Sequence, residues 1–278
     1  MKLIFDQLSH HTSKIATKRY STSFSLGIKF LDKELRQPIY DVYGFVRLAD
    51  EIVDSFHGFD KERLLADFRR QTFEAIQDGI SLNPILNAFQ NAVNKYNIPL
   101  DLIDTFLKSM EMDLNFEKYS QEDYETYILG SAEVVGLMCL KIFVFGNEDE
   151  YQRLKPHAMK LGSAFQKINF LRDLKDDYHQ LGRTYFPGID MSSFDDKVKK
   201  EIEADIDSDF HEGYLGILEL PKNSRFGVYM AYVYYYKLFM KIKACQADDI
   251  MNKRVRIPNN KKYRLFVSSY VKHSFNLV

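Results

Sequence analysis

The chain has 278 residues, with 38 Lys and Arg against 39 Asp and Glu and 45% hydrophobic residues. This balance is typical of a folded globular protein and excludes collagen, a coiled rod and a disordered tail. A formal net charge of -1 supplies no long-range field to attract nucleic acid, so no nucleic-acid partner is expected. Two cysteines outside any CxxC pattern exclude a disulfide framework and argue against structural zinc.

The first residues, MKLIFDQLSHH, lack the apolar core of a signal peptide, and no later window offers about 18 uninterrupted apolar residues. The longest apolar candidate, Val134 to Gly146, is interrupted by Lys141. We therefore expect a cytoplasmic protein whose membrane contact, if any, is peripheral and on the inner face. Because no repeat or low-complexity linker occurs, residues 1–278 are predicted to form a single domain.

Helix-sized blocks follow one another along the chain. Long proline-free intervals contain apolar residues at i, i+3, i+4 and i+7, whereas alternating strand patterns are scarce. Turn-like segments separate these blocks at Asn83-Pro84, Asn97 to Pro99, Gly182 to Gly188 and Pro258 to Asn260. The run from Tyr229 to Tyr236 has β propensity, but its flanks favour a buried helix. The fold class is therefore predicted to be an all-α bundle.

The segment from Tyr40 to Phe56 predicts a helix with one polar face. At ~100° per residue, four polar side chains fall in a stripe about 60° wide. They are Tyr43, Arg47, Asp50 and Asp54. Apolar side chains fill an arc directly beside this stripe, which predicts a half-buried border for the two carboxylates.

A second helix with a similar face is predicted from Leu161 to Tyr178. Its polar stripe contains Gln166, Asn169, Asp173 and Asp177, and apolar residues including Leu161, Ala164, Ile168 and Leu171 occupy the opposite side. The i, i+4 spacing of the aspartates places neighbouring carboxylates about 5 to 6 Å apart in each helix.

One acidic pattern alone is usually the solvated face of an amphipathic helix, but two such patterns point to a shared site. Neither stripe has a Lys or Arg one turn C-terminal to its aspartates, so the usual helical ion pairs are expected to be missing. Four facing carboxylates would repel one another unless cations separated them. Since Mg²⁺ prefers oxygen ligands and joins carboxylates to phosphate oxygens, the pattern predicts a Mg²⁺-bridged phosphate or diphosphate site between two helices.

Hydroxyl side chains from Tyr20 to Ser25 gather at a predicted helix start. They serve either as helix caps or, with the free amides, as contacts for diphosphate oxygens. Arg47 and Arg172 could add charge-assisted contacts to the same anion, although Arg172 lies off its stripe and could cap a neighbouring element instead. Residues 182–188 form either an ordinary connection or a lid that excludes water.

Six basic residues lie between Lys253 and Arg264. A solvated basic face explains them best, contact with an anionic membrane comes next, and nucleic acid last. The seven histidines show no metal-ligand spacing. The sequence contains no GxGxxG, P-loop or GxSxG motif, which leaves no basis for a Rossmann dehydrogenase, a Walker NTPase or a serine hydrolase.

Five ordered motifs extend along nearly the whole chain: Ser21-Thr22-Ser23-Phe24-Ser25, Tyr43-x3-Arg47-x2-Asp50-x3-Asp54, Gln166-x2-Asn169-x2-Arg172-Asp173-x3-Asp177, Gly182-Arg183-x-Tyr185-Phe186-Pro187 and Arg254-Val255-Arg256-Ile257-Pro258. In these motifs the sequence resembles the squalene/phytoene synthase family, all-α enzymes that join two polyprenyl diphosphates head to head. The last two look more like bacterial and plant phytoene synthases than squalene synthases. The resemblance implies an isoprenoid synthase-type helical bundle with a central cavity.

The resemblance also implies roles for individual residues. The implied Mg²⁺ ligands are Asp50, Asp54, Asn169, Asp173 and Asp177. The implied contacts to prenyl diphosphate are Tyr20, Ser21, Thr22, Ser23, Tyr43, Arg47, Gln166, Asn169 and Arg172. The four aspartates and Tyr43 are the expected catalytic residues, and either Tyr43 or the diphosphate itself serves as the proton acceptor. Mn²⁺ is expected to be able to replace Mg²⁺, and no nicotinamide cofactor is expected.

The sequence departs from the family pattern at two places. Leu129 and Glu133 replace a Tyr and a Gly of a central motif, and Asp248 and Asp249 stand where a Tyr often precedes the final basic motif. Both departures concern the expected pocket wall and therefore the selection of chain length.

The expected reaction is the Mg²⁺-dependent condensation of two geranylgeranyl diphosphates to phytoene, through a cyclopropylcarbinyl (prephytoene) diphosphate. The enzymatic alternative is a dehydrosqualene, squalene or presqualene diphosphate synthase that uses C15 substrates. The alternative from another class is a catalytically inactive helical scaffold or a membrane-binding protein.

Overall fold

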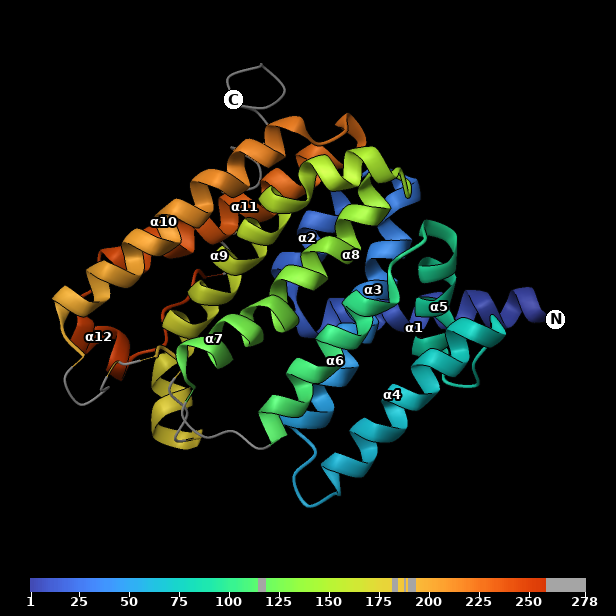
Figure 1. The fold of residues 1–278 in the computed structure, drawn as a ribbon, viewed down its shortest axis with the longest axis horizontal. Coiled ribbons are helices and arrows are strands. Elements are labelled where there is room, and N and C mark those ends of the chain that lie inside the picture. The colour runs from blue at the N-terminus through green and yellow to red at the C-terminus, as the bar shows by residue number, and fades with distance from the viewer. Residues whose placement is uncertain (115–118, 182–184, 188, 190–193, 259–278) are drawn as a thin grey trace.

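The computed structural model describes residues 1–114, 119–181, 185–187, 189 and 194–258, with side chains excepted at 176–181. Within these ranges the chain is helical and contains no strand (Figure 1). The helices are α1 (Lys2–Tyr20), α2 (Thr22–Lys29), α3 (Lys33–Asp54), α4 (Lys61–Asp78), α5 (Pro84–Tyr96), α6 (Leu100–Leu114), α7 (Gln121–Ile128), the π-helix η1 (Leu129–Glu133), α8 (Val134–Phe143), α9 (Glu148–Leu181), α10 (Asp196–Glu219), α11 (Lys222–Lys243) and α12 (Ala247–Asn252). The predicted all-α class is confirmed.

Local sequence signals explain several helix ends. The Asn83 side chain accepts a hydrogen bond from the Ile85 amide, and Pro84 begins α5 as the predicted turn requires. Asn97 ends the same helix in the left-handed conformation, with φ of 51°. Proline did not bound every helix, however. Pro38 lies inside α3 and Pro156 inside α9, because the surrounding tertiary packing outweighs the lost amide hydrogen bond.

The tyrosine-rich run is helical, as predicted, and belongs to α11. Figure 1 shows α9, α10 and α11 running beside one another, and buried side chains of these helices form one hydrophobic cluster. A second cluster joins α3 to α5, α6 and α8, with Phe45 of α3 stacked on Phe89 of α5 at a ring-centroid distance of 3.9 Å. The aromatic excess of the sequence therefore serves the core in the first instance.

The stretch from Gln121 to Phe143 is long and apolar enough to cross a membrane by length and composition, although the sequence analysis did not select it. Half of its most apolar window is buried inside the protein, as in a core helix. Lys141 within it is also buried, with its ammonium paired to Glu148 and lying 4.1 Å from the centroid of the Tyr151 ring. The packing of this stretch is therefore compatible with a soluble protein.

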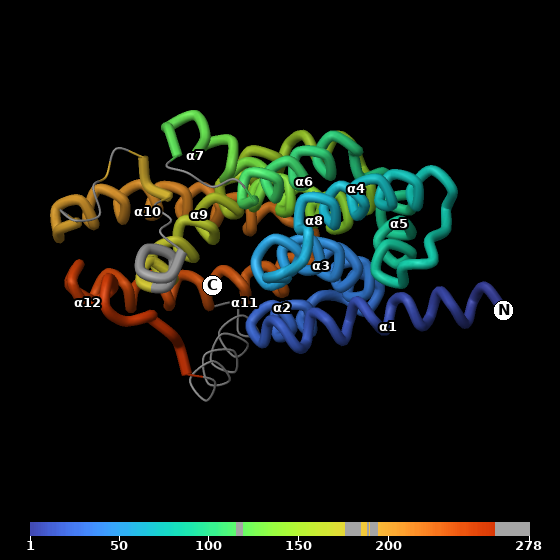
Figure 2. Tube along the Cα trace, turned by 90° about the horizontal axis from the view of Figure 1, so that it is seen from below, coloured from blue at the N-terminus to red at the C-terminus, as the bar shows by residue number. Residues whose placement is uncertain are grey.

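A central cavity lies between the two halves of the core. Its wall is formed by residues of α2, α3, α6, α7, η1, α8, α9, α10 and α11. Figure 2 shows the backbone of these helices, with α2 and α3 beside α1 and with α9 beside α10. Helix α3 and helix α9, which carry the two predicted polar stripes, both contribute to this wall. The fold thus brings to one space two segments that are far apart in the sequence.

Candidate active site

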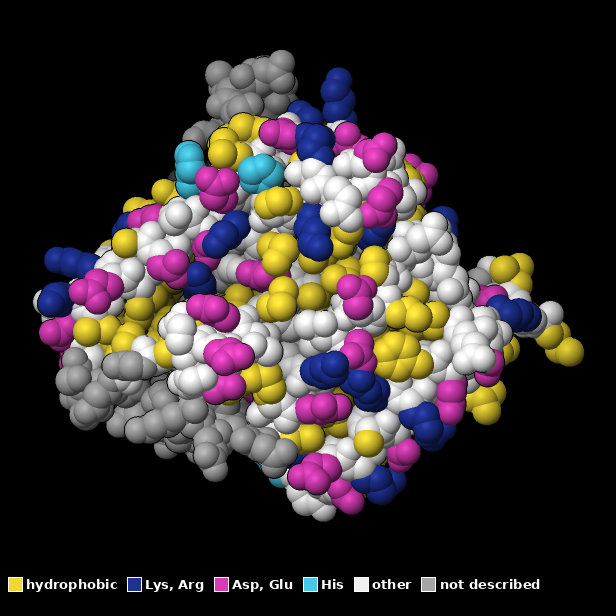
Figure 3. Space-filling model, viewed as in Figure 1, with side chains coloured by type: hydrophobic (Ala, Val, Ile, Leu, Met, Phe, Trp, Pro, Cys, Tyr) yellow, Lys and Arg dark blue, Asp and Glu magenta, His cyan; other side chains and the backbone are white. Residues whose placement is uncertain are grey.

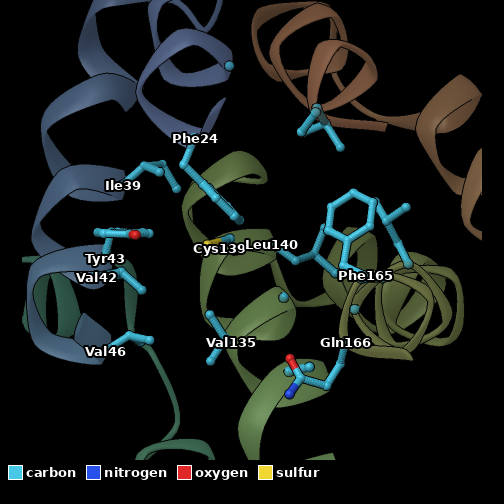
Figure 4. Close-up of a pocket in the computed structure, with 18 of the residues that line it drawn as sticks. Phe24, Ile39, Val42, Tyr43, Val46, Val135, Cys139, Leu140, Phe165 and Gln166 are labelled. Atoms are coloured by element: carbon cyan, nitrogen blue, oxygen red, sulfur yellow. The ribbon is translucent and has the colours of Figure 1, made fainter. Parts of the chain in front are cut away.

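The central cavity has a volume of about 360 Å³, within the usual range for small-molecule sites of roughly 300 to 1,000 Å³. Most of its wall is apolar, but polar side chains of both predicted stripes reach it. Figure 4 shows Tyr43 of α3 across the cavity from Phe165 and Gln166 of α9. Arg47 and Asp50 of α3 and Asn169 of α9 also line it. Five predicted site residues therefore share one cavity.

Arg47 organises the polar stripe of α3. Its guanidinium donates hydrogen bonds to the carboxylates of Asp50 and Glu51, and it lies over the ring of Tyr20 at 4.3 Å. The expectation that helical ion pairs are missing from this stripe was therefore wrong. The expectation considered only bases C-terminal to the aspartates, whereas Arg47 precedes Asp50 by one turn.

Asp50 is a crowded carboxylate. Burial raises its pKa to about 7, and the charges of Asp54 and Glu51 act in the same direction, while Arg47 opposes the rise. The side chain keeps 35% of its surface accessible and lines the cavity. A negative charge at this position is therefore poorly compensated by the protein and would be stabilised by a cation in the cavity.

Asn169 is the polar group of α9 with the most evident unused capacity. Its amide nitrogen donates to the Gln166 side-chain oxygen at 3.4 Å. Among the side chains that the structure describes, its own side-chain oxygen is buried without a hydrogen-bond partner. Tyr235 of α11 also hydrogen bonds with Asn169, although burial raises the pKa of that phenol to about 12. A buried acceptor without a partner is costly, which fits an oxygen that meets a donor or cation when the site is occupied.

Asp173 is held by two arginines. Arg172 Nε donates to Asp173 Oδ1 at 2.9 Å, and Arg254 Nε lies 2.6 Å from the same oxygen. Burial alone would lower the pKa of Arg172, but the hydrogen bond and charge of Asp173 raise it, so Arg172 stays charged. Sequence reasoning missed the Arg254 contact. The Arg254-Val255-Arg256-Ile257-Pro258 motif marked this arginine as a candidate, but the sequence did not indicate which residue it contacts.

A second pocket adjoins these arginines. It is lined by Tyr20 to Ser23, where α1 ends and α2 begins, by Arg172 of α9, and by Arg254 to Pro258 after α12. The Ser21 hydroxyl accepts a hydrogen bond from the Phe24 amide at 3.2 Å, so the helix-cap interpretation is confirmed. The same serine hydrogen bonds with Tyr43, whose pKa is raised by burial. Ser21 therefore caps α2 and also lines the pocket, as do the neighbouring Tyr20, Thr22 and Ser23.

Several predicted residues do not enter this description. The Asp177 side chain and residues 182–184 and 188 lie outside the described parts of the chain. Tyr185, from the predicted lid, is buried and stacks on Phe170 at 4.1 Å. Among the side chains that the structure describes, no three His, Cys, Asp or Glu groups converge as a metal site. The predicted Mg²⁺ ligands therefore stay a prediction.

The cavity wall contains aromatic residues that sequence reasoning did not select. The ring of Phe165 stacks on Tyr235 at 4.0 Å, and Phe24 packs against Tyr43 at 5.5 Å. Helical periodicity alone could not separate these rings from ordinary core aromatics.

Glu133, one of the residues at which the sequence departs from the family pattern, lies in the π-helix η1. It accepts a hydrogen bond from Ser163 of α9. It therefore ties η1 to α9 beside the cavity.

The described helices form a bundle in which α3 and α9, the two helices with acidic stripes, flank one largely apolar cavity. The squalene/phytoene synthase family model matches residues 17–261. The chain therefore belongs to the squalene/phytoene synthase family, whose members are prenyltransferases, and the resemblance seen in the motifs is confirmed.

Individual relatives agree with this assignment. The chain is 26% identical to phytoene synthase 1 of Solanum lycopersicum over 91% of its length, a match that spans 65% of the longer tomato protein. It is 27% identical to 4,4'-diapophytoene synthase of Staphylococcus haemolyticus over 69% of this chain and 67% of that one. A crystal structure of a dehydrosqualene synthase shares the fold, with a TM-score of 0.82, 22% identity and coverage of 97% of this chain and 98% of that chain.

Proposed function

We propose that this chain joins two geranylgeranyl diphosphates head to head, through a cyclopropylcarbinyl (prephytoene) diphosphate, to form phytoene in carotenoid biosynthesis. The observation that carries the proposal is the single cavity in which Arg47, Asp50, Gln166 and Asn169 adjoin a long apolar wall. Such a cavity suits a molecule with one polar head and an apolar tail. The name of the tomato relative, phytoene synthase 1, supports the C20 substrate.

The donors at the polar end suit Mg²⁺. The oxygen of Asn169 is buried and has no hydrogen-bond partner within the described parts of the chain, and Asp50 carries a charge that its surroundings raise in energy. We propose that Asp50 and Asp54 on α3, with Asn169, Asp173 and Asp177 on α9, hold Mg²⁺, with Mn²⁺ as a substitute and no nicotinamide cofactor. When bound, the ion would neutralise the diphosphate and make it a better leaving group.

The other polar groups of the chain would bind and orient the diphosphate. Arg172 and Arg254 can offer charge-assisted hydrogen bonds beside the hydroxyls of Ser21 to Ser23, which line the same pocket. Burial raises the pKa of Tyr43, so its phenol stays protonated at neutral pH. The departing diphosphate is therefore the better candidate for the proton acceptor in the last step.

The aromatic wall would protect the reacting carbon skeleton. Phe24, Phe165 and Tyr235 line the cavity, where their rings would keep out water that could quench an allylic cation. Their ring faces can also stabilise a positive charge by cation–π attraction. This role needs rigid rings, and the close stacking of Phe165 on Tyr235 supplies rigidity.

A C15 substrate is the alternative that specific observations favour. A relative is named 4,4'-diapophytoene synthase, and the similar folds include a dehydrosqualene synthase and a squalene synthase from Alicyclobacillus acidocaldarius. The same polar residues would serve either chain length, since they contact only the diphosphate. The two substrates differ in the length of cavity that the tail requires.

We also propose a cytoplasmic location, at the inner face of the membrane. The burial of much of the Gln121–Phe143 stretch in the core supports an association that is peripheral. The reaction supports the location as well, because its product would be an apolar hydrocarbon that dissolves in a bilayer.

The experiment that tests the function is incubation of the purified chain with Mg²⁺ and either farnesyl or geranylgeranyl diphosphate, with and without NADPH. Mass spectrometry of the hydrocarbon fraction identifies the product. We expect phytoene from the C20 substrate without NADPH. A C30 product would establish the C15 alternative, and no product with either substrate would leave the inactive scaffold as the better description.

A further inference from the structure

Helix α1 has its apolar and polar faces reversed. The residues that it buries against the protein are Ser9, Ser13 and Thr17, each with 0% exposure. On the opposite side, within an arc of about 40° at ~100° per residue, lie Ile4, Leu8 and Ile15. These three residues, the α1 stripe, are 70%, 55% and 47% exposed. A helix that only packs on the core would bury its apolar side chains and expose its polar ones. The exposed stripe therefore indicates a contact surface.

Basic side chains surround the α1 stripe. His11, Lys18 and Arg19 fall within about 60° of its centre, and all three are exposed. The acidic residue of this helix, Asp6, lies on the inner side, where it pairs with Lys2 and accepts a hydrogen bond from Asn87 at 3.0 Å. The outer face of α1 is therefore apolar along its middle and cationic along its margins.

The surroundings of α1 extend this surface. Asn87 also donates to Ser9 at 3.0 Å and accepts from the Ser81 amide, which ties the neighbouring loop to α1. That loop carries Leu82, which is 93% exposed. Figure 3 shows hydrophobic side chains on the tip that projects from the body, where Figure 1 places one end of α1, together with basic and acidic side chains.

We infer that the outer face of α1 docks on an anionic lipid membrane, with the stripe in the acyl boundary and the basic margins at the headgroups. Interfacial helices combine an apolar face with Lys and Arg in this way. Association of two copies through α1 fits the charges less well. A two-fold contact would bring two cationic helix faces together, whereas anionic headgroups complement them.

The position of α1 connects this surface to the cavity. Its last residue, Tyr20, lies against Arg47 and lines the second pocket. A helix lying in the membrane surface would therefore hold that pocket near the lipid. This consequence rests on the proposed function, whereas the docking itself does not.

The test is flotation of the full chain with vesicles of phosphatidylcholine, alone or mixed with phosphatidylglycerol. We expect at least about tenfold stronger binding to the anionic vesicles, weakened by added salt. The variant Ile4→Ser/Leu8→Ser/Ile15→Ser should lose at least about tenfold of that binding. The matched control Leu215→Ser/Leu218→Ser removes exposed leucines from α10, which are 37% and 45% exposed, and should bind as the unmodified chain does.

Circular dichroism of each variant shows whether the helices persist, and Lys18→Gln supplies a charge-only variant that should retain weaker, less salt-sensitive binding. Equal binding by the stripe variant and the unmodified chain would overturn the inference. A dimer in sedimentation velocity that the stripe variant dissociates, with no vesicle binding, would also overturn it and assign the stripe to contact between copies. Turnover of detergent-dispersed substrate is measured in parallel, so loss of docking and loss of the proposed reaction are distinguished.

Discussion

Asp50 is a residue whose ionised state the fold disfavours. It lies near Asp54 and Glu51, and burial raises its pKa to about 7 although Arg47 is bound to it. The folded protein therefore bears an electrostatic cost when the Asp50 carboxylate is ionised. Residues that reduce stability in this way are frequent at functional sites, because the charge is needed by a ligand and not by the fold.

We expect Asp50→Asn to lower turnover by at least about 100-fold, because the neutral amide cannot supply the negative charge that would help to hold Mg²⁺ beside the diphosphate. The neutral side chain also relieves repulsion from Asp54, so stability should not fall. Product formation and circular dichroism measure the two effects. Asp78→Asn, at the exposed end of α4, is the control, and Asp173→Asn should lose activity in the same way. Full turnover with Asn at position 50 would contradict the model with two acidic stripes.

At the scale of elements, α1 is attached to α3 by a buried polar contact. His10 Nδ1 lies 2.8 Å from Asp41 Oδ2, and Gln37 donates to the other oxygen of Asp41 at 2.9 Å. The hydrogen bond with Asp41 raises the pKa of His10 against the effect of burial, while burial raises the pKa of Asp41. The attachment is therefore strongest when His10 is protonated.

The sign of the pH dependence follows from these two directions. A raised His10 pKa contributes stability that is complete below the unfolded value of about 6.5 and is lost as pH rises through the folded value. The raised pKa of Asp41 acts in the same direction from about 3.8 upward. We expect His10→Ala to lower the free energy of unfolding by about 1 to 3 kcal/mol near pH 6, with a smaller difference near pH 9. Denaturant unfolding at both pH values measures it, and exposed His11→Ala is the matched control.

Helices α9 and α10 approach closely at Gly216. A Cβ atom placed there would lie 2.3 Å from the Cβ of His157, and neither atom is the flexible end of a side chain. We expect Gly216→Ala to separate the two helices and to lower the free energy of unfolding by about 1 to 3 kcal/mol. The neighbouring Leu215→Ala, at an exposed position, should change it by about 0.5 kcal/mol or less. Equal unfolding midpoints for the two variants would show that the helix contact yields without strain.

At the scale of the whole molecule, the helices of the bundle pack around a central cavity. Residues of α2, α3 and the helices from α6 to α11 surround the cavity, and two hydrophobic clusters on its flanks supply the stability that the empty space cannot. Protein interiors normally leave few such voids, so a preserved cavity indicates room for a ligand. Its size must then match the length of the prenyl tail.

We expect Ala231→Leu to narrow this cavity from its α11 side and to favour C15 over C20 substrate. Ala231 lines the cavity and lies near Gly27 of α2, so the longer side chain takes space that the tail would use. The ratio of kcat/KM values for the two substrates should shift by about tenfold or more. Competition between farnesyl and geranylgeranyl diphosphate measures that ratio. An unchanged ratio would place the determinant of chain length elsewhere in the wall.

The sequence by itself determined the helical class and most of the polar site. Apolar periodicity set which faces of α3 and α9 turn to the core, and Ile168 and Leu171 are fully buried as predicted. Local chemistry set the start of α5 at Pro84 and the cap of α2 at Ser21. The in-phase spacing of Tyr43, Arg47 and Asp50 is also local, because residues one turn apart share a face in any helix.

Only the tertiary structure decided which of these faces meet. Arg254 reaches Asp173, and Tyr235 reaches Asn169, across long sequence separations that no local pattern encodes. The reversed faces of α1 contradict helical patterning for the same reason: Gly44 of α3 leaves room only for a small residue such as Ser13. Periodicity shows that one face of a helix is apolar. Whether a neighbouring helix covers that face or leaves it exposed to a membrane is set by the packing of the whole chain.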